Sequence, residues 1–148
     1  MTLRQAIACA LLAAAMGAQA SHKPGKFDPR RFEAALEQYI TTEAALTPSE
    51  AAAFFKLYRE MKGKQRVLFR QMMETRHTDL SDEKACREAV RRHDELDMEM
   101  KRLQSEYHGR FIDALSGAKV VRIMNAEERF HRQELKKAAG RAGKRGGK

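Results

Sequence analysis

Two Glu-x-x-His pairs are the residues of this sequence whose types and spacing could do metal chemistry. Glu74 pairs with His77, and Glu128 pairs with His131. Residues three positions apart share one face of a helix. In di-iron bundles, two such pairs on two helices bind the metals together with one glutamate from each of the other two helices. We interpret the pairs as coincidence, because glutamate is frequent here and the first predicted helix is too short for such a bundle.

A looser metal site would draw on the other imidazoles and on thioether sulfurs. The candidates are His93, His108 and His131, with Met98 and Met100 as softer ligands. No cluster of Cys and His has the spacing of a structural zinc site. The sequence also lacks a nucleophile elbow, a glycine-rich phosphate loop and a His-Glu-x-x-His motif. We therefore predict that the protein is not an enzyme and holds no metal or other cofactor.

Length and charge narrow the class of protein. At 148 residues, with 29 Lys and Arg against 20 Asp and Glu, the chain is predicted to be one basic domain of net charge +9. Positive charge of this size favours an acidic partner or an anionic surface. Nucleic acid is not the predicted partner, because the cations are spread over every predicted helix among acidic neighbours and because the chain begins with an export signal.

That signal is a predicted cleaved signal peptide at 1–20. Arg4 precedes a short apolar run, and a small-x-small cleavage site follows at Ala18–Ala20. The run is too short to span a membrane, and no other stretch is apolar enough. We expect a periplasmic protein that is not embedded in the membrane, with a flexible lead at 21–27. Cys86 is then the only cysteine, and its place on an apolar seam predicts that it is buried.

Helix-start signals divide the rest of the chain into four helices. Thr47 and Glu50 form the strongest one, a capping box with a proline at the first helical position. A leucine precedes this start and the last one, at Leu46 and Leu115. The expected caps of the other three helices are Asp28, Ser81 and Ser116. We expect the last helix to end at Gly140, with an all-helical domain at 28–139 and a disordered basic tail at 140–148.

Two long helices dominate the predicted fold. Apolar residues from Ala51 to Met72 recur at steps of three and four, on one face of a helix that runs to about His77. A heptad seam runs from Cys86 to Tyr107 and continues towards Leu115. We therefore predict an all-α fold of four helices, in which the second and third form a long antiparallel hairpin. Because the neighbouring helices cannot cover the whole seam, we also predict a homodimer.

The helix starts make the chain, from about Phe27 to Ala139, resemble the Spy/CpxP family of periplasmic proteins. That family has two L-T-x-x-Q motifs, each of which opens a helix. The matching segments here are LTPSE at 46–50, with Glu50 in place of glutamine, and LSGAK at 115–119, with serine and lysine substituted. The stretches FFKLYREMKGKQ and AKVVRIMNAEERFHR are similar to a Bacteroidetes-type branch, whose members are often labelled heavy-metal or sigma-factor-linked sensors.

The resemblance implies a curved helical cradle and two alternative functions. One is an ATP-independent chaperone that binds unfolded or partly folded polypeptides in envelope stress. The other is a stress or heavy-metal sensor that acts on a membrane or sigma-factor signalling partner. For the chaperone we expect the client-binding surface on the second helix, where apolar area alternates with long cations. Its expected residues are Phe54, Phe55, Tyr58, Arg59, Lys62, Arg66, Phe69, Arg70 and Met72.

Overall fold

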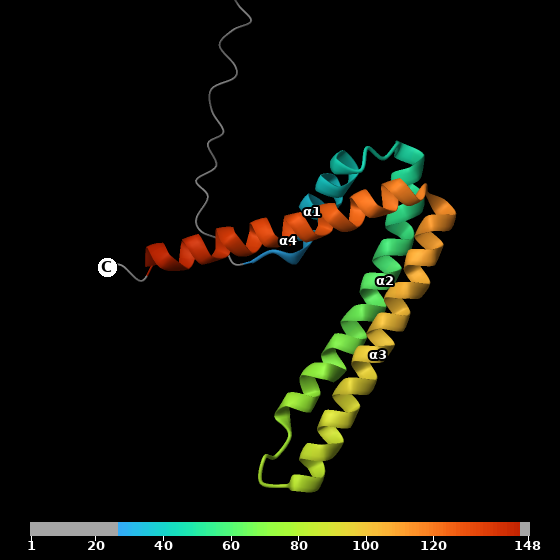
Figure 1. Ribbon diagram of the computed structural model, residues 1–148. Helices are drawn as coiled ribbons and strands as arrows, with labels where there is room; N and C mark the ends of the chain where they lie inside the picture. Colours follow the sequence, from blue (N-terminus) through green and yellow to red (C-terminus); the bar gives the residue numbers. More distant parts are fainter. Residues whose placement is uncertain (1–26, 146–148) are drawn as a thin grey trace, which may run out of the picture.

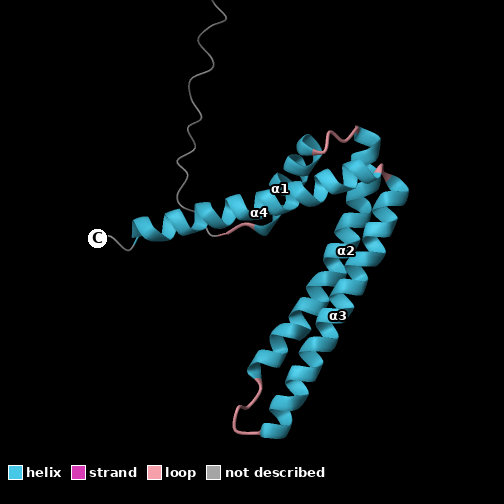
Figure 2. Ribbon diagram, viewed as in Figure 1, coloured by secondary structure: helices cyan, strands magenta, loops and turns pink. Residues whose placement is uncertain are grey.

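The computed structural model describes residues 27–145, and within that range the protein is all-helical (Figures 1 and 2). The helices are α1 (Pro29–Glu43), α2 (Pro48–Glu74), α3 (Glu83–Ala114) and α4 (Gly117–Arg145), and a 3-10 turn (Thr75–His77) follows α2. The predicted all-α class with four helices is confirmed for the described residues. The predicted signal peptide and residues 21–26 of the predicted lead lie outside them.

The four helices form two arms that meet at a corner. α1 and α4 lie side by side as one arm, and α2 and α3 lie side by side as the other (Figure 1). The α1–α2 loop and the α3–α4 junction both sit at the corner, so the chain has the shape of an elbow.

Local capping explains where three of the helices begin. Thr47 and Glu50 form the predicted capping box: the Thr47 hydroxyl accepts from the Glu50 amide at 3.3 Å, and the Glu50 carboxylate accepts from the Thr47 amide at 2.8 Å. That carboxylate also accepts from the Lys119 ammonium at 2.5 Å, which links the start of α2 to α4. The Lys119 contact, together with the Thr47 amide, lowers the pKa of Glu50 to about 2. Asp28 and Ser116 likewise accept from amides in the first turns of α1 and α4.

Two predicted helix limits are wrong. Asp82, and not Ser81, caps α3, because its carboxylate accepts from the Ala85 amide at 3.0 Å. The Ser81 amide and hydroxyl are instead bonded to Asp79, at 2.9 and 2.7 Å. α4 continues past Gly140 to Arg145. A single glycine costs a helix only about 1 kcal/mol, and the Ala, Lys and Arg around this one are good helix formers.

The turn between α1 and α2 was not predicted. The Leu46 amide donates to the Thr41 carbonyl at 3.0 Å and the Ala45 amide donates to the Thr42 carbonyl at 3.2 Å, which is the pattern of a Schellman motif. Ala45 has a φ of 48°, in the left-handed region that glycine usually occupies. The turn directs Leu46 into the core, where its side chain is buried.

The hydrophobic core lies at the corner. All four helices and the α1–α2 loop contribute to it. Its buried residues are Leu36, Ile40, Ala44, Leu46, Phe54, Phe55, Tyr58, Met61, Tyr107, Phe111, Leu115, Val120, Ile123, Ala126 and Phe130. Farther out along the α2–α3 arm, in residues 62–104, Leu96 is the one buried side chain. The outer part of that arm is therefore a pair of helices with very little core of its own.

The predicted heptad seam faces α2, although its outer end is poorly covered. Its members are buried near the corner and half-buried towards the tip of the arm. Cys86 is one of the half-buried residues, and its thiol lies 3.5 Å from the Asp79 carbonyl. The prediction that Cys86 is buried is therefore wrong, because only the short turn after α2 lies beside it.

Candidate functional site

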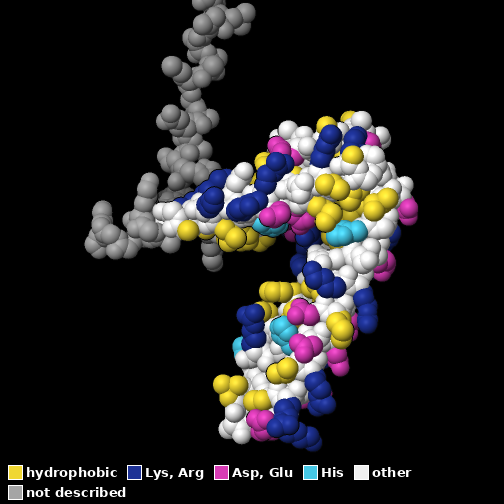
Figure 3. Space-filling model, viewed as in Figure 1, with side chains coloured by type: hydrophobic (Ala, Val, Ile, Leu, Met, Phe, Trp, Pro, Cys, Tyr) yellow, Lys and Arg dark blue, Asp and Glu magenta, His cyan; other side chains and the backbone are white. Residues whose placement is uncertain are grey.

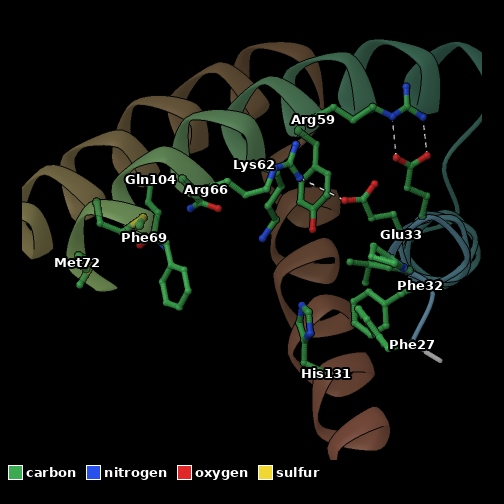
Figure 4. A pocket seen from close by; sticks show the side chains of 16 residues that line it. Phe27, Phe32, Glu33, Arg59, Lys62, Arg66, Phe69, Met72, Gln104 and His131 are labelled. Carbon is green, nitrogen blue, oxygen red and sulfur yellow. Dashed lines mark hydrogen bonds and ion pairs between the residues drawn. The ribbon is translucent and has the colours of Figure 1, made fainter. Parts of the chain in front are cut away.

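A groove of about 770 Å³ lies on the inner side of the elbow, and we call it the inner-corner groove. Figure 4 shows its side chains, which come from the start of α1, the outer two-thirds of α2, one stretch of α3 and the middle of α4. The lining residues are Phe27, Pro29, Phe32, Glu33, Leu36, Glu37, Tyr58, Arg59, Lys62, Gln65, Arg66, Phe69, Met72, Met100, Gln104 and His131.

Apolar side chains stand at both edges of this groove without being buried. Phe69 is 58% exposed on the α2 side, and Phe27 is 73% exposed on the α1 side. Phe69 and Met72 lie on one side of the opening, and Phe27, Phe32 and His131 lie on the other (Figure 4). Hydrophobic side chains gather on the inner side of both arms in Figure 3. The groove therefore offers accessible apolar area on two facing walls.

Ion pairs cross the floor of the groove from one arm to the other. The Arg59 guanidinium donates to both carboxylate oxygens of Glu37 on α1, at 2.7 and 2.5 Å. The Arg66 guanidinium lies 3.2 Å from Glu33, which is also on α1. The hydrogen bonds to Glu37 raise the pKa of Arg59. These cations, which the sequence suggests as charges that attract a ligand, are thus already paired with carboxylates of the same chain.

Glu127 of α4 is a largely enclosed carboxylate at the corner. It accepts from the Tyr58 hydroxyl at 2.8 Å and from the Lys62 ammonium at 2.5 Å, and the His131 ring lies 3.7 Å away. Burial acts to raise the pKa of Glu127, but the Lys62 charge and these hydrogen bonds outweigh it and lower that pKa. Burial and the same carboxylate raise the pKa of Tyr58. This group joins α2 to α4 through charge and hydrogen bonds.

The structure divides the predicted client-binding residues into two groups. Five of those expected on the second helix line the groove with exposed or partly exposed side chains: Arg59, Lys62, Arg66, Phe69 and Met72. Phe54, Phe55 and Tyr58 are buried in the core, with 0%, 6% and 5% of their surface exposed. These three are therefore core residues and not accessible side chains, although Tyr58 touches the groove from beneath. Arg70 is exposed but does not line the groove.

Sequence reasoning missed the walls of the groove that α1, α3 and α4 supply. The rings of Phe27 and Phe32 lie together at the start of α1, with centroids 5.6 Å apart. The sequence suggested Met100 as a soft metal ligand. No local signal in the sequence places these residues opposite α2, because the corner brings together residues more than twenty positions apart.

The metal candidates do not come together. His77 belongs to the turn at the tip of the α2–α3 arm, whereas His131 packs against Phe32 at the corner. His93 lies 3.7 Å from Asp97 on the surface of α3, and the ring of His108 lies beside that of Phe111. Within the described residues, no group of three or more His, Cys, Asp or Glu side chains is placed to hold a metal ion.

No protein-family model matches this chain, and no curated protein or solved structure matches it. The resemblance to the Spy/CpxP family therefore stays a prediction. Over the described range, none of the helices has a stretch that is both long enough and apolar enough to cross a membrane.

Proposed function

We propose that this protein is an exported, ATP-independent chaperone-like protein that binds apolar segments of unfolded polypeptides in the inner-corner groove. Export to the periplasm rests on the sequence of residues 1–20, and a role in envelope stress rests on the Spy/CpxP resemblance. In this proposal the elbow serves as the helical cradle that the resemblance implies, with the α2–α3 hairpin as one wall and the α1–α4 arm as the other.

The accessible aromatic groups on facing walls of one groove support the proposal best. Phe27 and Phe69 expose most of their surface, and Met72 and Met100 add flexible thioether side chains to the lining of the groove. Grouped exposed apolar side chains on a soluble protein commonly mark a binding surface. The charged residues on the floor of the groove keep this surface hydrated, which disfavours collapse of one arm onto the other.

Replacing Phe69 by alanine is expected to weaken the binding of an unfolded client roughly tenfold. A half-exposed aromatic ring that becomes buried on binding contributes about 1.5 kcal/mol, and 1.4 kcal/mol corresponds to a factor of ten. The measurement is a fluorescence anisotropy titration with labelled, permanently reduced α-lactalbumin. Ile112→Ala is the matched control, because Ile112 is 55% exposed on α3 and does not line the groove.

Equal losses from Phe69→Ala and Ile112→Ala would show that the groove is not the binding site. If the wild-type protein neither binds the client nor suppresses aggregation of several unrelated clients at low salt, the chaperone proposal fails. The sensor or adaptor alternative would then take its place. Tight stoichiometric uptake of zinc or copper by the purified protein would support that alternative.

We also propose that the protein is a homodimer that associates through the outer part of the α2–α3 arm. Leu96 is the one buried residue there, and Val90, Met98 and Leu80 expose 62%, 52% and 87% of their surface. A second copy would cover this apolar area and supply the core that the two helices lack. Sedimentation velocity at micromolar concentration should give the mass of a dimer, and a clean monomer would overturn the proposal.

A further inference from the structure

The positive charge of this protein is concentrated at one end of the chain. Residues 132–148 contain seven Lys or Arg and one Glu, a net charge of +6, whereas the 131 residues before them carry +3. The predicted basic tail at 140–148 is the last part of this segment. The concentration of charge coincides with the one described part of the fold that has no neighbouring helix.

That part is the α4 overhang, which we define as residues 132–145. The last core contacts of α4 are made by Phe130, whose ring lies 5.3 Å from that of Phe32 and 5.5 Å from that of Tyr39. After Phe130 no residue is buried as far as Arg141. At 1.5 Å per residue, the helix extends roughly 20 Å beyond the α1–α4 contact. Figure 1 shows this end of α4 projecting beyond the start of α1.

Two of the four cations in residues 132–141 of the overhang are paired with a carboxylate, and two are not. Arg132 lies 3.4 Å from Glu128 and Lys137 lies 2.7 Å from Glu134, whereas Lys136 and Arg141 have no carboxylate at ion-pair distance among the described residues. In Figure 3, dark blue side chains lie along the upper edge of α4.

An apolar strip accompanies this basic surface. Leu135 is 71% exposed, and Ala138 and Ala139 follow it on the same side of the helix at steps of three and four. None of the hollows described along the two arms is lined by residues 132–141. Over residues 132–141, the overhang therefore presents positive charge and a shallow apolar side, away from the hollows described above.

We propose that the α4 overhang binds the surface of an anionic lipid bilayer. A basic helix with a modest apolar side lies in the interface of such a bilayer, with its cations among the headgroups and its apolar side towards the acyl chains. Nucleic acid would use the cations alone and leave Leu135 in water. A folded acidic protein would need a complementary groove of its own to cover Leu135. The site is separate from the inner-corner groove, so it does not depend on the chaperone proposal.

The test is co-sedimentation of the full protein with phosphatidylcholine vesicles that contain phosphatidylglycerol. Each Lys or Arg close to an anionic surface strengthens binding roughly fivefold. The triple variant Lys136→Gln, Lys137→Gln, Arg141→Gln should therefore bind roughly a hundredfold more weakly than the wild type. Wild-type binding should disappear in high salt and should not occur with pure phosphatidylcholine.

The matched control is Lys56→Gln, Lys84→Gln, Lys101→Gln, which removes the same charge from exposed sites on α2 and α3. This variant should change vesicle binding by less than about fivefold, because its three lysines lie away from the helix segment that contacts the bilayer. Circular dichroism should show the same helicity for both variants. The proposal is overturned if the wild type does not bind anionic vesicles or if both variants lose binding equally. It is also overturned if the overhang binds only duplex DNA or poly-glutamate.

Discussion

Replacing Phe54 by alanine is expected to lower the free energy of unfolding by about 3–5 kcal/mol. The side chain is fully buried, and its ring lies 4.8 Å from that of Phe111 and 5.0 Å from that of Phe55. Removing it leaves a cavity where α2 and α3 meet at the corner, and close neighbours cannot fill it without breaking their own contacts. Urea unfolding should show a lower midpoint with an unchanged slope.

The control for this prediction is Phe69→Ala on the same helix. Because Phe69 is 58% exposed, its loss should change the free energy of unfolding by less than about 1 kcal/mol. The two variants thus separate stability from binding: the first should unfold easily, and the second should stay folded but bind a client poorly. A loss below about 1 kcal/mol for Phe54→Ala would contradict the position of the core at the corner.

The contrast between Phe54 and Phe69 shows what helical periodicity predicts and what it does not. Both residues belong to one apolar pattern on α2, and the pattern predicts correctly that α2 is a long amphipathic helix. It does not show how far along that helix the other elements reach. α1 and α4 cover α2 only near the corner, so Phe54 is core and Phe69 is surface. The burial of a helical residue depends on which other elements pack against the helix, and the periodicity of that helix alone does not predict this.

Features formed by residues close together in the sequence were predicted best. The capping box of Thr47 and Glu50 involves two side chains and two amides within one turn, and it is present as predicted. The predicted cap of α3 was wrong because both Ser81 and Asp82 are good N-cap residues. The Ser81 hydroxyl donates to the Asp79 carboxylate instead, and Asp82 caps the helix. The predicted end of α4 was wrong because the composition after Gly140 suggested disorder, although the residues around this glycine favour helix.

The groove itself could not be predicted from the sequence. The pairing of Arg59 with Glu37 joins residues 22 positions apart across the corner. On the sequence, Arg59 is one of several cations on the polar side of a helix, and nothing distinguishes it from Arg70. The turn at Ala45, where a residue other than glycine adopts a positive φ, sets the direction of α1 relative to α2. Without that turn, the walls of the groove have no defined position.

Replacing Glu127 by alanine is expected to lower the free energy of unfolding by about 2–3 kcal/mol. The carboxylate is only 23% exposed and is the acceptor for both Tyr58 and Lys62. Its loss leaves the buried Tyr58 hydroxyl without this partner and the Lys62 ammonium without a counter-charge. Lys62 is 32% exposed and can regain some water, which keeps the loss at this level. Small-angle scattering should also show a wider distribution of elbow angles.

The adjacent residue supplies the control, because Glu128 is 72% exposed and pairs only with Arg132 at the surface. Glu128→Ala should change the free energy of unfolding by less than about 0.5 kcal/mol.

The folded-state pKa of Glu127 lies below its ordinary value of 4.5. Its stabilisation is therefore complete above that value and is lost as the pH falls through the lowered pKa. The difference between wild type and Glu127→Ala, measured by urea unfolding, should shrink in acid. A difference that stays constant into strong acid would show that packing, and not the charge of Glu127, joins the two arms.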